Sequence, residues 1–89
     1  MKAVITVTGK DTVGIIADVS AVCSKHNANI LEITQSVLSE YFAMIMLADI
    51  EKLNVSFSDF VDVLTALGDA KGLAIHTMHE DIFNTMHHI

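Results

Sequence analysis

The segment at residues 9–14 is the part of the sequence whose residue types are best suited to holding a ligand. Its residues are Gly9, Lys10, Asp11, Thr12, Val13 and Gly14. Gly9 allows a sharp turn, and Gly14 leaves the backbone of a first helical turn open to close approach. Because N–H groups at the start of a helix attract a carboxylate, the segment predicts a site for a small anionic group. The simpler interpretation, in which the glycines only turn the chain and ease helix packing, stays open.

The spacing of the two glycines is also that of a phosphate-binding loop. The Lys-Ser/Thr pair that must follow the second glycine is replaced by Ile15-Ile16, which excludes an NTPase of that kind. A small acylphosphatase-like enzyme would need an arginine in its phosphate loop, and the chain has no arginine. An anionic ligand group must therefore be held by backbone N–H groups, by a lysine or by polar side chains.

The histidines are the candidate metal ligands. His76 and His79 are three apart in an alternating segment and are expected to point to opposite faces. Zinc held by His79 with His87 or His88 at a seam between two copies is the alternative. No cysteine or acidic residue lies at the spacing of a closed site, so we predict no metal and no cofactor.

The candidate catalytic groups have simpler structural roles. Cys23, with His26 nearby in sequence, belongs to an apolar stripe and is expected to pack as a small hydrophobic residue. Asp59 and Asp62 lie outside the apolar stripe of their helix and are typical of a solvated face rather than an acid/base pair. We therefore predict no catalytic residues and no enzymatic activity.

Composition narrows the class of protein. The chain has 89 residues, 52% of them hydrophobic, and no linker-like segment, which predicts a single domain over residues 1–89. The net charge of −6 and the scattered lysines exclude direct nucleic-acid binding. The longest apolar run, Tyr41 to Ala48, is too short to span a membrane. One cysteine and no signal-peptide pattern predict a cytoplasmic protein.

Hydrophobic periodicity predicts the elements that position the loop at residues 9–14. Alternation predicts four strands, at Ala3–Thr8, Ile30–Leu38, Tyr41–Ile50 and Leu73–His79, with a tight turn at Ser39-Glu40. Helical spacing predicts one helix from Ile15, capped by Asp11 or Thr12. It predicts a second after the cap Ser56, with Phe60, Val63, Leu64 and Leu67 on its apolar face and Gly68 or Gly72 at its end. A short terminal helix follows from Asp81, with Ile82, Met86 and Ile89 on one face.

This order predicts an α+β fold, the ferredoxin-like βαββαβ sandwich. Right-handed crossovers place the first and third strands at the centre of an antiparallel four-stranded sheet, with two helices on one face, plus the short C-terminal helix. The third strand is apolar on both faces and should be covered on both. Because the helices cover only one face, we expect a homodimer in which a partner covers part of the bare side or extends the sheet.

The order and spacing of these features resemble an ACT domain. The residues that carry the resemblance are Gly9-Lys10-Asp11, Val13-Gly14-Ile15-Ile16, Asn29-Ile30 and Asp49-Ile50. The whole chain is similar to small stand-alone ACT-domain proteins and to one half of the glycine-cleavage repressor regulators.

The resemblance implies a non-catalytic regulatory domain that pairs and binds an amino acid between the loop after the first strand and a neighbouring subunit. It implies that Gly14 makes room for the ligand, that Asp11 meets its amino group, and that Asn29 and Ile30 lie near the same pocket. A regulated enzyme or a transcription regulator is the implied further partner. The Arg-Pro common in the family is Thr12-Val13 here. The alternative is therefore a structural dimerisation adaptor with a vestigial pocket.

Overall fold

The computed structural model describes residues 1–10 and 14–86, so Asp11, Thr12 and Val13 and the last three residues lie outside the described part. Its elements follow the predicted order. They are β1 (Lys2–Lys10), α1 (Ile15–Lys25), β2 (Asn29–Leu38), β3 (Tyr41–Asp49), α2 (Phe57–Lys71), β4 (Ala74–His79) and α3 (Glu80–Met86). Within residues 1–10 and 14–86, no helix combines the length and the apolar character needed to cross a bilayer.

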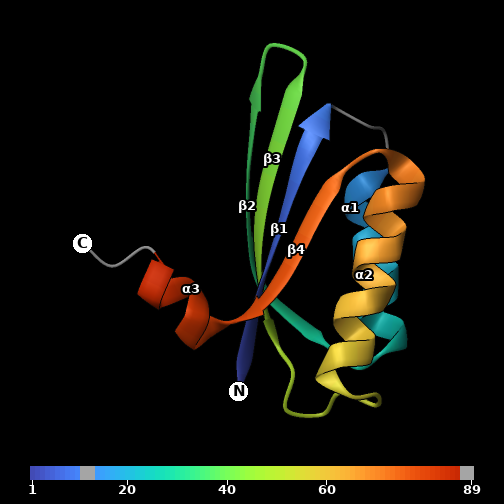
Figure 1. Ribbon diagram of the computed structural model, residues 1–89, viewed down its shortest axis with the longest axis vertical. Coiled ribbons are helices and arrows are strands. Elements are labelled where there is room, and N and C mark those ends of the chain that lie inside the picture. The colour runs from blue at the N-terminus through green and yellow to red at the C-terminus, as the bar shows by residue number, and fades with distance from the viewer. Residues whose placement is uncertain (11–13, 87–89) are drawn as a thin grey trace.

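The four strands form one antiparallel sheet in the order β2-β3-β1-β4. Helices α1 and α2 lie side by side on one face of it (Figure 1). The predicted ferredoxin-like plan is therefore confirmed, with β1 and β3 at the centre. The register pairs Ile5 with Met46 and Val7 with Met44, so the large apolar side chains of the two central strands lie together under the helices.

The core lies between the sheet and the two helices. The sheet contributes alternate residues of β1, β3 and β4, as the period of a strand requires. The largest fully buried side chains are Phe60, Ile5, Met44, Met46, Leu64, Val7, Val19 and Cys23.

Helix α2 begins and ends with recognisable signals. The Ser56 side chain accepts a hydrogen bond from the Asp59 N–H at 3.0 Å, which confirms the predicted cap. Gly72 ends the helix in a left-handed conformation with φ of 71°. Gly68 lies buried inside α2 against Leu73 and Ile75, where a larger residue would clash. Of the two predicted ends, Gly72 is the correct one.

Two local expectations are wrong, and a third is not tested. Helix α1 has Gly14 at its N-cap position, and the predicted cap residues Asp11 and Thr12 lie outside the described residues. Val63 was expected on the apolar face of α2 but is 37% exposed, because the core-facing stripe is narrower and centres on Phe60 and Leu64. A bulge between Ile30 and Glu32 inserts Leu31 as an extra residue and breaks the predicted alternation of β2.

The second face of the sheet is only partly covered. Helix α3 stands on the side opposite α1 and α2, against β1 and β4 (Figure 1). Val4, which points to that side, is only 4% exposed. The expectation that helices cover one face alone therefore needs correction, because the terminal helix shields part of the other. The outward side chains of β3 remain open: Ile45 and Tyr41 are exposed, so β3 is not covered on both faces within one chain.

Candidate functional site

Gly9 and Lys10 end strand β1 at the start of the candidate ligand loop. Gly9 has φ of 158°, and a Cβ there would collide with the side chain of Leu73. Packing against Leu73 is therefore a sufficient reason for a glycine at this position. Lys10 is exposed, and its Nζ lies 3.6 Å from the Glu40 carboxylate across the β2–β3 turn. The next three residues of the predicted site, Asp11, Thr12 and Val13, lie outside the described residues.

Gly14 is distinguished by its backbone conformation and by the space around it. Its φ of 86° is a left-handed conformation that glycine adopts without strain. Apart from its chain neighbours, no atom of the described residues lies within 4 Å of the position that a Cβ would take, and the residue is exposed. No side chain in the described part of the chain caps the first N–H groups of α1, whereas in α2 Ser56 accepts a hydrogen bond from one. Within residues 1–10 and 14–86, the first N–H groups of α1 therefore have no side-chain partner and lie beside an open space at Gly14.

Asn29 and Ile30 lie at the other end of α1. The helix has 11 residues, which corresponds to a length of about 16 Å, and Gly14 stands before its first turn while Asn29 follows its last. The structure therefore does not bring Asn29 and Gly14 together within one chain. Asn29 is exposed, and Ile30 is partly buried against the core.

The surroundings of Asn29 are polar. It borders a hollow of about 360 Å³ together with Asn27, Asp49, Glu51 and Lys52. In sequence, Asp49 ends the apolar strand β3 and Glu51 and Lys52 follow it, a signal that the sequence analysis did not use.

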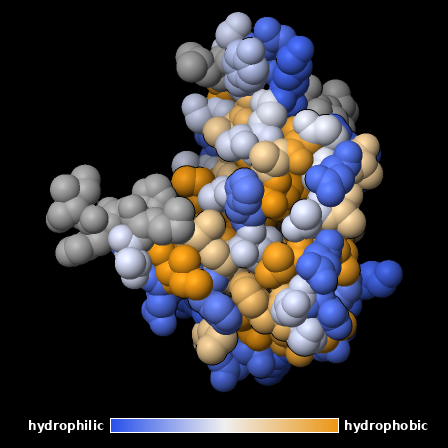
Figure 2. All heavy atoms as spheres, viewed as in Figure 1, coloured by the Kyte–Doolittle hydropathy of each residue, from blue (hydrophilic) through white to orange (hydrophobic). Residues whose placement is uncertain are grey.

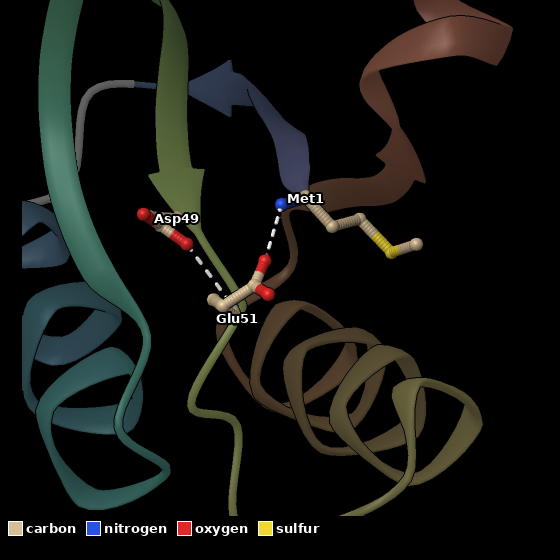
Figure 3. A network of polar contacts seen from close by, with 3 residues as sticks. All are labelled: Met1, Asp49 and Glu51. Atoms are coloured by element: carbon tan, nitrogen blue, oxygen red, sulfur yellow. Dashed lines mark hydrogen bonds and ion pairs between the residues drawn. The ribbon is translucent and has the colours of Figure 1, made fainter.

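Two of these carboxylates are already engaged (Figure 3). Asp49 accepts a hydrogen bond from the Glu51 N–H at 2.9 Å, and Glu51 Oε2 lies 2.7 Å from the amino group of Met1. The hydrogen bond that the Met1 amine donates to the Glu51 carboxylate raises the pKa of the amine above its ordinary value. These contacts tie the start of β1 to the end of β3.

The candidate nucleophile Cys23 has no activating partner among the residues that the structure describes. Cys23 is fully buried, and desolvation raises the pKa of its thiol to about 11. The ring of His26 is held by its Nδ1, 2.8 Å from the Val22 carbonyl oxygen, and is tilted against Phe60. A neutral thiol packed in the core is a poor nucleophile, so these residues have a structural role.

The histidines of β4 are placed as their spacing predicts. His76 pairs with Thr6 and is exposed on the second face, whereas His79 stacks on Phe57 of α2 with ring centroids 4.0 Å apart. Among residues 1–10 and 14–86, no group of three or more His, Cys, Asp or Glu side chains could hold a metal ion. His87 and His88, the other residues of the alternative zinc site, lie outside the described residues.

Comparison with protein families shows to which family this chain belongs. A model of the ACT domain matches residues 2–78, which includes every strand except the last residue of β4 and both large helices. The chain belongs to the ACT-domain family. Domains of this family are typically regulatory and bind ligands.

The ACT domain described here has relatives of the same size. It is 46% identical over 89 residues to a UPF0237 protein of Clostridium perfringens, with all of both chains covered. The structure of an ACT domain protein from Streptococcus pneumoniae is 36% identical and superposes with a TM-score of 0.80, covering 93% of each chain. A protein proposed to be a glycine cleavage system transcriptional repressor is 25% identical with a TM-score of 0.69. In that match, 85% of this chain and 43% of the other are covered.

Proposed function

We propose that this chain is a non-catalytic regulatory ACT domain that binds a small amino acid at a site shared by two copies. The observation that carries the proposal is the start of α1, where no side chain of residues 1–10 and 14–86 fills the space at Gly14 or caps the first N–H groups. Such N–H groups bind a carboxylate well, because they are unsatisfied donors at the positive end of the helix dipole.

The second half of the proposed site comes from the partner. Gly14 and Asn29 lie at opposite ends of α1, so a two-fold axis beside this helix would bring the Asn29 of one copy toward the Gly14 of the other. The surface beside α1 supports such pairing, because β2 is an edge strand with exposed apolar side chains. These are Leu31, Ile33 and Val37.

The chemistry of the two halves fits an α-amino acid. The N–H groups after Gly14 would donate hydrogen bonds to the ligand carboxylate. The side-chain oxygen of Asn29, with the acidic groups beside it, would accept hydrogen bonds from the ligand ammonium group. Gly9, Lys10, Asp11, Thr12, Val13 and Ile30 would complete the walls. Glycine is the first ligand to test, because one of the similar proteins is proposed to repress the glycine cleavage system.

A thermal-shift series tests this function. Each amino acid is added singly at millimolar concentration, with glycine and serine first, and the melting temperature is measured. A ligand that binds only the folded state at a hundred times its Kd stabilises it by about 2.7 kcal/mol, which raises the melting temperature of a domain this small by about 10 °C or more. An unchanged melting temperature with every amino acid would contradict the proposal.

A structural adaptor is the second candidate function. The observation that favours it is Thr12-Val13, which replaces the Arg-Pro common in the family. An adaptor would keep its dimer while showing no ligand-dependent shift in the same series. In either case we propose that the 89 residues act as one domain in the cytoplasm, where the lone Cys23 stays reduced, and that the output reaches a regulated enzyme or a transcription regulator.

A further inference from the structure

The face of the sheet opposite α1 and α2, called the open face below, is nearly free of charge at its centre. Its side chains between the strand ends are Val4, Thr6 and Thr8 of β1, Ala43, Ile45 and Leu47 of β3, Ala74, His76 and Met78 of β4, and Glu32, Thr34 and Ser36 of β2. The charged residues on this face lie at its margin, with Lys2, Asp49 and Lys10 at strand ends and Glu32 on the edge strand β2. An uncharged centre within a charged rim is the arrangement of a protein interface.

Helix α3 projects from this surface. It stands out from the open face (Figure 1), and its main contacts are with β1 and β4. Ile82 on α3 is 53% exposed, and Phe83 is partly exposed. Figure 2 shows hydrophobic residues at the surface where α3 meets the sheet. A helix of seven residues has little stability of its own, so it needs packing on more than one side.

We propose that the open face and α3 together bind a second copy of this chain, with α3 of each copy packed on the open face of the other. Helix α3 is about 10 Å thick and prevents two sheets from meeting directly. It covers the end of the face near Val4, which leaves the end near Thr8 and Ala43 for the partner's helix. Two such helices side by side need about 20 Å, and strands of nine residues are about 30 Å long.

The area available lies at the lower end of that of a stable dimer. Four strands at a spacing of about 4.8 Å, three of them about 30 Å long and β4 about 20 Å long, present about 540 Å² on one face, of which α3 already covers about 100 Å². The exposed sides of α3 add a helix surface about 10 Å long. The sum approaches the roughly 600 Å² per partner at the lower end of stable interfaces. A second copy is the matching occupant because each copy offers one projecting helix and one bare stretch of sheet to receive it.

This interface lies on a different surface from the β2 edge in the proposed ligand-binding pair, so the two together predict a tetramer. The test is the mass in solution, measured by light scattering, of the native full chain and of three variants, with a fourth variant as the control. Ile45→Lys and Ile82→Lys each remove the open-face contact, and Val37→Lys removes the edge contact. Val63→Lys on α2 is the matched control, because Val63 is also an exposed apolar residue but lies on neither surface. Circular dichroism confirms that each variant is folded.

We expect both open-face variants to halve the mass of the native assembly and the Val63 control to leave it unchanged. The proposal is overturned if Ile45→Lys and Ile82→Lys retain the native mass, or if the native protein is a monomer. If the native protein is a monomer, the open face would instead bind a different protein. Loss of mass in the Val37→Lys variant alone would support the edge pair and overturn the open-face interface, so the two ideas are tested separately.

Cross-linking gives a second readout that does not depend on mass. Ala43→Cys protein mixed with Ile82→Cys protein should form a disulfide-linked dimer on oxidation, because the arrangement places α3 of one copy over Ala43 of the other. Native Cys23 is fully buried and does not interfere. Ala43→Cys protein oxidised alone is the control and should remain a monomer on a denaturing gel. An equal yield of cross-linked dimer in the mixture and in the control would contradict the proposed arrangement.

Discussion

At the scale of single residues, burial decides which polar groups have a chemical role. The sequence correctly assigned Cys23 to the apolar stripe of its helix, since its spacing matches that of Ile15 and Val19, and all three are buried. The roles of the glycines could not be separated by sequence. Gly9 and Gly14 have the same side chain, yet one is needed for contact with Leu73 and the other for a left-handed turn beside open space. Only the position of Leu73, which precedes β4 and is brought close to Gly9 by the fold, distinguishes them.

The thiol of Cys23 predicts a specific loss of stability at alkaline pH. Burial raises its pKa to about 11 from an ordinary value of 9.0. Below pH 9 the thiol is protonated in both states. Between pH 9 and 11 the unfolded state loses the proton first, so the free energy of unfolding falls with rising pH, by up to about 2.7 kcal/mol in total. Urea denaturation across this range measures the fall.

Cys23→Ala is the control for this prediction. The variant has no thiol, so its free energy of unfolding should decline less steeply between pH 9 and 11, whatever its stability at neutral pH. Parallel curves for the two proteins would show that the thiol is not desolvated in the folded state.

At the scale of elements, local patterns predicted most of the chain. The four strands, the β2–β3 turn and the Ser56 cap depend on neighbours in sequence, so alternation and capping signals were sufficient. The errors fall where contacts far apart in the chain decide. The bulge at Leu31 follows from pairing with β3, and the exposure of Val63 follows from how α2 lies on the sheet. The start of α1 at Ile15 was predicted correctly, whereas its predicted cap residues, Asp11 and Thr12, lie outside the described residues.

The Ser56 cap gives a prediction at this scale. In Ser56→Ala the Asp59 N–H loses its acceptor, so we expect the free energy of unfolding to fall by about 1 kcal/mol, as is usual for this position. Chemical denaturation measures the difference. Ser56→Asp should restore most of the stability, because a carboxylate accepts the same bond and also interacts favourably with the helix dipole. If alanine and aspartate have equal effects, the cap contributes nothing measurable.

At the scale of the whole molecule, the sequence indicated that one chain does not hide all its apolar surface, but not where the remainder lies. The side of the sheet on which α3 packs depends on how the chain changes direction between His79 and Glu80, for which no local pattern exists. The prediction of the candidate site from the sequence was limited in the same way. Gly14 and Asn29 were predicted to share a pocket, yet α1 separates them within one chain. Whether they meet is a property of an assembly, which a single sequence does not encode in its spacing.

The shared site predicts complementation between two inactive variants. Gly14→Leu places a side chain in the space proposed for the ligand, and Asn29→Ala removes the proposed acceptor of its ammonium group. If each site takes Gly14 from one copy and Asn29 from the other, neither variant alone binds, because both of its sites carry one defect.

A heterodimer of the two variants behaves differently. One of its sites carries both defects and the other carries none, so mixing equal amounts and allowing exchange should restore about half a site per heterodimer chain, measured by titration calorimetry with the ligand found in the thermal-shift series. Gly14→Asn is the matched control for backbone effects, because asparagine tolerates a left-handed conformation and keeps α1 folded. If the mixture binds no better than either variant alone while the native protein binds, the ligand does not lie between Gly14 of one copy and Asn29 of the other.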